Sequence, residues 1–233
     1  MQFIDREHKG IKPKVIILRL SHQYMINYTY IVIDSCSNLA VIIDPAWQID
    51  KIKEAVSNFN LSLEGILITH AHPDHVHLAK PLSVMYNCPI WISKHEIVYS
   101  GYNADRLIGI DSEPWSIGGM RIEPLLTPGH TPGSICFLIS DYLFTGDTLF
   151  AEGCGMCSDI ESAYSMFESL DFLKRYLNPH TLIYPGHMYV LPLGQQFSQL
   201  LSKNIYLQFK CKEDFANFRL RKEQNKKKFF KFQ

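Results

Sequence analysis

A cluster of metal-ligating side chains follows a short apolar run that predicts a buried strand over residues 65–69. In an extended segment residues i and i+2 point the same way, so His70 and His72 can present their imidazoles to one ion. Pro73 keeps His72 out of the helical region, and the chain is then expected to turn into a helix. The candidate ligands of this segment are His70, His72, Asp74 and His75.

Three later segments share one pattern, in which a predicted strand ends, a glycine turn follows and a ligand-type side chain lies in the turn. Glycine permits positive φ and close backbone approach, which suits a side chain held rigidly at a sheet edge. Each segment alone indicates only a turn, but together with the first cluster they point to one site. The three side chains are His130, Asp147 and His187.

These side chains divide into two ligand groups. The first consists of His70, His72 and His130, the second of Asp74, His75 and His187, and Asp147 could bridge them. Imidazole and carboxylate without thiolate suit zinc, and iron or manganese could occupy the same set. Three protein ligands per ion leave an open position, which is typical of catalytic sites. Two zinc ions could hold a hydroxide between them, and Asp74 could orient it as a catalytic residue.

Strand-like and helix-like segments alternate in both halves of the chain. Each sheet has to bury both of its faces, so we expect an α/β fold in which two mixed sheets carry helices on their outer faces, a four-layer sandwich. The expected strands are 15–20, 28–33, 40–43, 65–69, 89–93, 121–127, 134–140, 142–145 and 181–184, and the expected helices are 48–59, 74–86 and 161–177.

Charge is balanced over the whole chain but not along it. The 23 basic and 23 acidic side chains leave no excess that would draw the protein to nucleic acid or to an anionic membrane surface. Residues 201–233 are strongly basic, whereas the first 200 residues are acidic. The longest apolar runs are too short to span a bilayer, and acidic residues stand where a signal peptide would have its apolar core, so we expect a cytoplasmic protein without membrane contact.

With these motifs the sequence resembles the metallo-β-lactamase superfamily over residues 15–187, from the His-x-His-x-Asp-His segment to the later His, Asp and His. The resemblance implies an αββα sandwich with the metals at one edge. Asp44-Pro45 also resembles the family's Asp-Pro-Gly turn, with Ala46 in place of glycine. We expect residues 1–190 to form the catalytic domain and residues 191–233 a basic helical extension packed on it.

Within the superfamily the chain looks most like the glyoxalase II type, and closer still to the zinc-dependent hydrolases of bacterial trans-acyltransferase polyketide clusters. The closer match rests on residues 144–157, on Asn204-Ile205-Tyr206 and on residues 218–222. It implies hydrolysis of a thioester whose acyl group is carried on phosphopantetheine, on an acyl carrier protein or on coenzyme A. The basic extension could dock an acidic carrier through Lys210, Lys212, Arg219, Arg221, Lys222, Lys226, Lys227 and Lys228.

Other activities of such a site stay open at this point. A glyoxalase II-type glutathione thioester hydrolase usually has Gly-Cys-Gly-Arg where this chain reads Gly-Cys-Gly-Met156, and it has a longer helical domain than residues 188–233 provide. A mononuclear-iron persulfide dioxygenase uses part of the same ligand set. A lactonase needs the same metals, and a non-catalytic carrier-protein binding module could retain the metal structurally.

Overall fold

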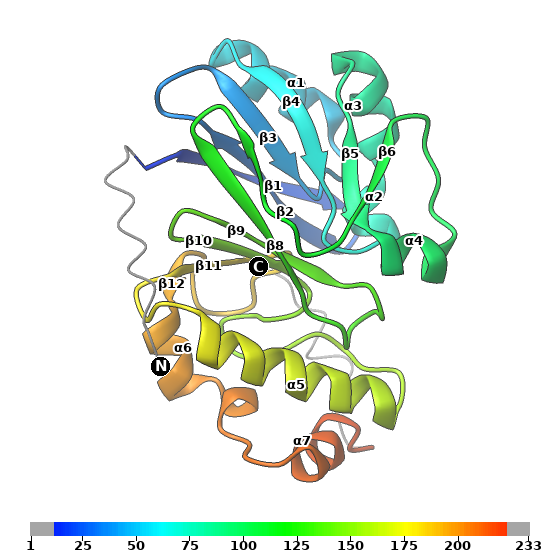
Figure 1. Cartoon of the computed structure of the whole chain (residues 1–233), viewed down its shortest axis with the longest axis vertical. Helices are drawn as coiled ribbons and strands as arrows, with labels where there is room; N and C mark the ends of the chain where they lie inside the picture. Colours follow the sequence, from blue (N-terminus) through cyan, green and yellow to red (C-terminus); the bar gives the residue numbers. More distant parts are fainter. Residues whose placement is uncertain (1–11, 223–233) are drawn as a thin grey trace.

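The computed structural model describes residues 12–222, which form two sheets packed face to face with helices on both outer faces (Figure 1). The first sheet, in spatial order, contains β1 (Lys14–His22), β2 (Met25–Ile33), β3 (Leu39–Ile43), β4 (Ser62–Leu67), β5 (Ile90–Ser93) and β6 (Leu107–Ile110). The second contains β12 (Gln195–Gln196), β11 (Leu182–Pro185), β10 (Tyr142–Gly146), β9 (Ile135–Ile139), β8 (Met120–Leu126) and β7 (Trp115–Ile117). The expected four-layer αββα sandwich is confirmed.

Helices cover the outer face of each sheet (Figure 1). In chain order they are α1 (Ile49–Asn58), α2 (Pro73–Val76), α3 (Ala79–Tyr86), α4 (Lys94–Ser100), α5 (Ile160–Tyr176), α6 (Phe197–Lys203), the 3₁₀ helix η1 (Ile205–Leu207) and α7 (Lys212–Arg219). Within residues 12–222, no helix is long and apolar enough to cross a bilayer.

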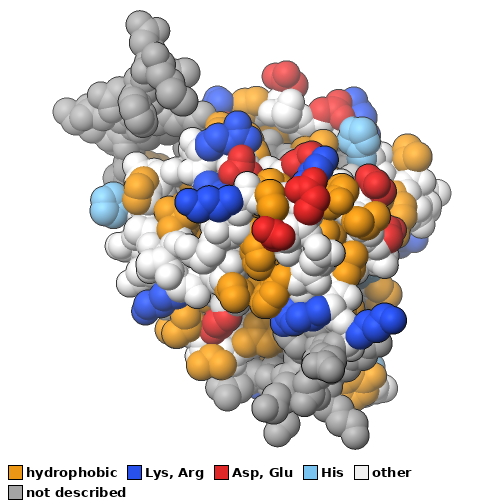
Figure 2. All heavy atoms as spheres, turned by 90° about the horizontal axis from the view of Figure 1, so that it is seen from below, with side chains coloured by type: hydrophobic (Ala, Val, Ile, Leu, Met, Phe, Trp, Pro, Cys, Tyr) orange, Lys and Arg blue, Asp and Glu red, His pale blue; other side chains and the backbone are white. Residues whose placement is uncertain are grey.

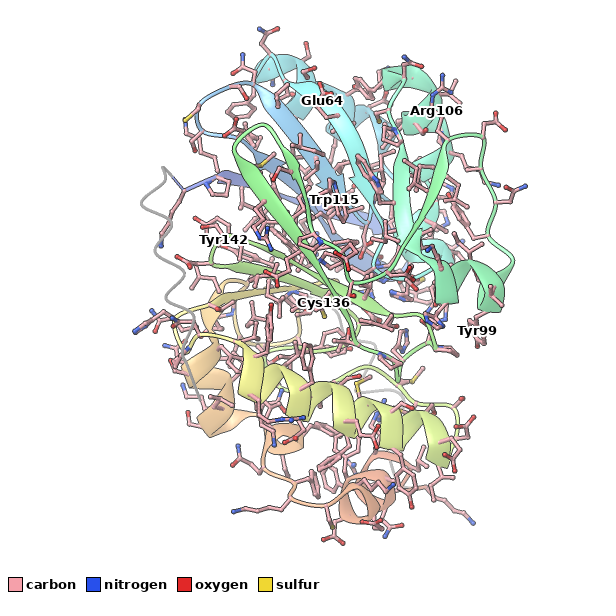
Figure 3. The ribbon with its side chains drawn as sticks, in the orientation of Figure 1. Glu64, Tyr99, Arg106, Trp115, Cys136 and Tyr142 are labelled. Atoms are coloured by element: carbon pink, nitrogen blue, oxygen red, sulfur yellow. The ribbon has the colours of Figure 1, made fainter. Side chains whose placement is uncertain are left out.

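Alternation along the strands produces three separate apolar clusters. In β2, Ile31 and Ile33 pack with α1 and α3, whereas Tyr30 and Val32 point the other way, toward the second sheet. The central cluster also holds Trp115 of β7, labelled in Figure 3, whose ring centre lies 5.3 Å from that of Trp91 in β5. The third cluster joins the second sheet to α5, α6 and α7. Each sheet is therefore buried on both faces.

The helix expected over residues 74–86 is wrong in one respect, because it is broken into α2 and α3. In a continuous helix the Leu78 N–H would donate to the Asp74 carbonyl. Instead Leu78 N donates to Pro45 O at 3.0 Å, and the side-chain amide of Asn27 donates to Asp74 O at 3.0 Å. Both backbone groups are thus satisfied by distant segments, which periodicity along one helix cannot reveal.

Helix α4 and strands β6, β7 and β12 are absent from the sequence expectation. A local signal for α4 exists, since Ser93 is its N-cap and its hydroxyl accepts from Glu96 N at 3.0 Å. The three strands are two to four residues long and lie at or near sheet edges, so pairing with a neighbour defines them more than their own composition does.

The C-terminal region packs on α5 as far as Phe218, and residues 220–222 are exposed. The remainder of the expected extension, residues 223–233, lies outside the described residues, as do residues 1–11. Phe215 of α7 is fully buried, with its ring centre 5.8 Å from that of Phe167 in α5 and 5.7 Å from that of Tyr206 in η1. Helix α7 is thus attached to α5 through a buried aromatic cluster.

We expect Phe215→Ala to lower the free energy of unfolding by about 3–5 kcal/mol, because it removes a fully buried aromatic side chain and leaves a cavity. Urea denaturation followed by circular dichroism measures this. Phe59→Ala is the matched control, since Phe59 is 58% exposed, and its effect should stay within about 0.5 kcal/mol. Equal effects of the two variants would contradict the packing of α7 on the domain.

Candidate metal centre

The seven predicted ligands all lie at one edge of the sandwich, where strands end. His70 and His72 follow β4, and Asp74 and His75 lie in α2 directly after them. The other three belong to the second sheet: His130, Asp147 and His187 follow β8, β10 and β11 respectively. The structure therefore brings together side chains from both sheets at one edge.

The first group is His70, His72 and His130, whose ligand atoms lie within 4.8 Å of one another. His72 Nδ1 lies 3.0 Å from His70 Nε2 and 3.0 Å from His130 Nε2. Three nitrogen atoms thus converge on one point, as three of the four ligands of a tetrahedrally coordinated cation would.

The second group is Asp74, His75 and His187, all three of them buried. Asp74 Oδ2 lies 3.3 Å from His187 Nε2 and 3.6 Å from His75 Nε2. This set of two nitrogen atoms and one oxygen atom also fits a divalent cation.

Asp147 lies between the two groups. Its Oδ1 is 3.4 Å from His75 Nε2 and 3.5 Å from His187 Nε2, while its Oδ2 is 3.7 Å from His130 Nε2. One carboxylate oxygen therefore faces each group, an arrangement in which a single carboxylate can serve two cations.

Backbone carbonyls orient two of the imidazoles. His187 Nδ1 lies 2.8 Å from Ile26 O, and His130 Nδ1 lies 2.9 Å from Met156 O. Because a carbonyl oxygen only accepts, Nδ1 must carry the proton in both rings, and the lone pair of Nε2 faces the site. The tautomer needed for metal binding is thereby fixed.

Asp44 orients His75, a role that the sequence analysis did not assign. Asp44 Oδ2 lies 2.8 Å from His75 Nδ1 and accepts from Thr69 Oγ1 at 2.6 Å, while its Oδ1 accepts from Thr69 N at 2.8 Å. Asp44 adopts a left-handed φ of 49° at the end of β3. The likeness of Asp44-Pro45 to a family turn was the signal for this residue.

Asn27 and Trp47 fix the Asp74 carboxylate, and sequence reasoning missed both. The Asn27 amide donates to Asp74 Oδ2 at 2.9 Å, and the Trp47 indole N–H donates to Asn27 Oδ1 at 2.9 Å. The indole thus settles which way the amide points. Neither residue belongs to a recognisable motif, because the contact joins β2, the turn after β3 and α2.

Glu96 connects two ligand-bearing loops and was also missed. Its Oε1 accepts from Ala71 N at 2.8 Å, and its Oε2 accepts from Thr131 Oγ1 at 2.6 Å. Ala71 lies between two predicted ligands and Thr131 follows a third. The carboxylate of Glu96 is buried and holds the two loops in register across the sheets.

Two further residues that flank ligands do not contact them directly. Thr145 donates to Leu149 O at 2.7 Å, and the ring of Tyr184 stacks on that of Phe144 with centres 5.4 Å apart. They stabilise the ends of β10 and β11 and so hold the backbone from which Asp147 and His187 project.

The pKa values of His70 and His75 shift in opposite directions. Burial lowers the pKa of His70 well below its usual value, and the neighbouring His75 adds to this. Burial also disfavours protonation of His75, but the surrounding carboxylates, Asp44 foremost, outweigh it and raise the His75 pKa to about 10. A cation that takes the Nε2 position of His75 therefore displaces a proton.

Two buried atoms indicate that a cation belongs here. His75 Nε2 and Asp147 Oδ1 are buried without a hydrogen-bond partner among the described residues, although buried polar atoms are normally satisfied. Both atoms face the second group. The chemistry of the donor set, imidazole and carboxylate, fits zinc or a similar divalent ion at this position.

An αββα sandwich whose strand ends gather five imidazoles and two carboxylates at one edge is the setting of a known class of proteins. The chain belongs to the metallo-β-lactamase superfamily, which residues 24–187 match. The resemblance stated from the motifs is confirmed.

Two relatives with similar names match almost the whole chain. The chain is 44% identical over 209 residues to "Probable polyketide biosynthesis zinc-dependent hydrolase BaeB" of Bacillus velezensis, covering 89% of this chain and 93% of the relative. It is 42% identical over 213 residues to the correspondingly named PksB of Bacillus subtilis, covering 91% and 95%.

More distant relatives include a hydroxyacylglutathione hydrolase of Blochmanniella pennsylvanica, 37% identical over 66% of this chain and 59% of its own length. The mitochondrial persulfide dioxygenase ETHE1 of Bos taurus is 32% identical over 78% of this chain and 72% of its own length. Among solved structures, a metallo-β-lactamase from Staphylococcus aureus superposes with a TM-score of 0.80 at 22% identity, covering 91% of this chain and 67% of that one, which shows the shared fold.

We expect Asp44→Asn to weaken zinc binding about 10- to 100-fold, because an orienting partner of a ligand is lost while shape is kept. Asparagine tolerates the left-handed backbone of this position. Competition with a chromophoric chelator measures the affinity. Asp34→Asn is the control, since Asp34 accepts from Ser37 and Gly119 and touches none of the seven ligands; unchanged zinc affinity in Asp44→Asn would refute the role of Asp44.

Proposed function

We propose that the protein is a metal-dependent hydrolase that uses two zinc ions to cleave a thioester. The observation that carries the proposal is the position of Asp147, with one oxygen toward His75 and His187 and the other toward His130. A carboxylate placed between two complete three-ligand groups suits a pair of ions better than a single one. The names of the relatives from the two Bacillus species support hydrolysis with zinc.

The proposed substrate is an acyl group on a phosphopantetheine thioester, borne by an acyl carrier protein or by coenzyme A. The support is the likeness to relatives named for polyketide biosynthesis, which extends over nine-tenths of the chain. Glutathione thioesters are less well supported, because the hydroxyacylglutathione hydrolase is matched over little more than half of its length.

The residues of the chain would divide the work of hydrolysis among them. Zinc, when bound, would polarise the carbonyl of the substrate and lower the pKa of a bound water to about 7. Asp74 has its Oδ2 held by Asn27 and facing the second group, and its other oxygen would accept a hydrogen bond from the attacking water and so orient it. His130 and His187 keep their Nδ1 protons on backbone carbonyls, which prevents their rings from turning during the reaction.

The proposed partner is an acidic carrier protein that docks on basic side chains of the C-terminal region. Of the basic residues expected to dock a carrier, Arg219 is buried, whereas the described C-terminal region also holds Lys210, Lys212, Arg221 and Lys222. The first turn of α7 adds the acidic Glu213 and Asp214. Figure 2, which views the molecule from the side of α5–α7, shows basic and acidic side chains interspersed among apolar ones. Lys226, Lys227 and Lys228 lie outside the described residues.

A mononuclear-iron persulfide dioxygenase is the second candidate, favoured by the relative ETHE1. The two activities differ in what they consume, since only the dioxygenase takes up oxygen.

We expect the purified protein to bind two zinc ions per chain, to hydrolyse acyl-pantetheine thioesters and to take up no oxygen, because two complete ligand groups are present. Elemental analysis, a panel of acyl thioesters and an oxygen electrode measure these. One iron per chain with persulfide-dependent oxygen uptake would replace the proposal.

We expect His72→Ala to lose one ion per chain and to reduce turnover about a thousandfold or more. Charge stabilisation by a metal is worth several kcal/mol, and each 1.4 kcal/mol changes a rate about tenfold. Thioester hydrolysis and zinc content are measured on the same preparation. His95→Ala is the control, because His95 is exposed on α4 and belongs to neither ligand group. If His72→Ala retains full turnover, the site is not the catalytic one.

A further inference from the structure

Residues 150–157 form a loop that lies directly behind the metal centre. At Gly155 an added Cβ atom would lie 2.0 Å from the backbone oxygen of Asp147 and 3.1 Å from His130 Cβ. The loop backbone therefore touches the segments that carry two predicted ligands, and no side chain fits between them. A shift of this loop would therefore displace His130 and Asp147.

The same loop determines the orientation of His130. The carbonyl of Met156, the residue after Gly155, accepts the Nδ1 proton of His130 at 2.9 Å. On the other side of the ring, His130 Nε2 lies 3.0 Å from His72 Nδ1, at the centre of the first ligand group. The position of Met156 O thus sets where the Nε2 lone pair points.

The C-terminal region holds the beginning of the loop through Asn204. The Asn204 side-chain amide donates to Phe150 O at 3.0 Å and to Gly153 O at 3.0 Å, and the residue is fully buried. Its Oδ1 accepts from Tyr206 N at 2.9 Å, which fixes the direction of the amide. One side chain that follows α6 therefore satisfies two carbonyls of the loop.

The C-terminal region holds the end of the loop through Arg219. The Nε of Arg219, in the last turn of α7, donates to Gly155 O at 2.8 Å. The side chain is only 5% exposed, and its guanidinium lies 5.8 Å from the centre of the Tyr206 ring. A charged group is costly to bury, so its retention beside the loop indicates a specific partner and not a solvated surface position.

We infer that the segment 204–219 is a positioning element of the metal centre: Asn204 and Arg219 fix the 150–157 loop so that Met156 O holds His130 in its metal-binding orientation. Neither residue contacts the ligand groups, so both act through the loop. The inference rests on His130 being a metal ligand, as the proposed function has it, but not on the identity of the substrate. It also gives a physical reason for Asn204, Tyr206 and Arg219, which belong to the two late segments that carried the closer family resemblance.

Arg219→Met tests the inference, because the methionine side chain reaches only as far as the position of Nε and has no donor for Gly155 O. We expect affinity for cobalt(II) at the His130 site to fall about 10- to 100-fold, the usual effect of losing an orienting contact. The cobalt(II) visible absorption bands should also change, since they report ligand geometry. Chelator competition and absorption spectra measure both, and circular dichroism with urea denaturation reports folding separately.

The matched control is Arg221→Met, two residues along the same chain. Arg221 is exposed and lies with its guanidinium 3.7 Å from the centre of the Phe218 ring, away from the loop. Its variant should keep wild-type cobalt affinity and spectrum. Should Arg219→Met fold, bind two ions with wild-type affinity and show the wild-type spectrum, the inference is overturned, whatever its urea midpoint.

Asn204→Asp provides a second test if Arg219→Met does not fold. Aspartate keeps the oxygen that accepts from Tyr206 N, and it replaces the amide that donates to the loop with a carboxylate oxygen that repels Phe150 O and Gly153 O. Asn178→Asp is its control, since exposed Asn178 uses only its oxygen, to accept from His180 N. A wild-type chain that binds no metal would contradict the proposed function. Metal binding that is unchanged by Asn204→Asp would contradict this inference alone.

Discussion

The buried carboxylate of Asp44 is the interaction on which the rest of the site depends. A charge in the interior is tolerated only where donors surround it, and Asp44 has Thr69 N, Thr69 Oγ1 and the His75 ring. Its backbone oxygen also accepts from Thr29 Oγ1 at 2.6 Å. One residue thus ties together β2, β3, the end of β4 and α2, and it does so at the edge where the ligands project. The geometry of the metal centre follows from the way the first sheet ends.

Local rules were sufficient to predict the sandwich and the gathering of its ligands. The i, i+2 alternation paired His70 with His72, and the glycine turns at strand ends placed His130, Asp147 and His187 at one edge. The alternation and the glycine turns each depend on residues that are close together along the chain. The division between α2 and α3 was beyond such rules, because Leu78 and Asp74 find their hydrogen-bond partners in Pro45 and Asn27, which belong to other segments.

The residues that support the ligands were harder to foresee than the ligands themselves. Asn27, Trp47 and Glu96 use ordinary side chains in ordinary sequence contexts, and their roles exist only where three elements meet. Arg219 was read as part of a basic surface for an acidic partner, whereas the fold buries it beside a loop carbonyl. Charge counting assigns a residue to the surface by its type, and a packed interior can overrule that assignment.

Each predicted ligand group combines side chains from both sheets. His70, His72, Asp74 and His75 follow β4 of the first sheet, and the other three predicted ligands follow strands of the second. Any cation held by His130 together with His70, or by His187 together with Asp74, would cross-link the halves of the sandwich. Ions bound only to the native state add RT ln(1 + [L]/Kd) to stability, about 2.7 kcal/mol at a hundredfold excess over Kd. If zinc binds as proposed, the cohesion of the two halves would therefore depend on the free zinc concentration. The ions that would activate water would thus also hold the two sheets together, and metal supply would govern how long the protein persists as well as how fast it turns over.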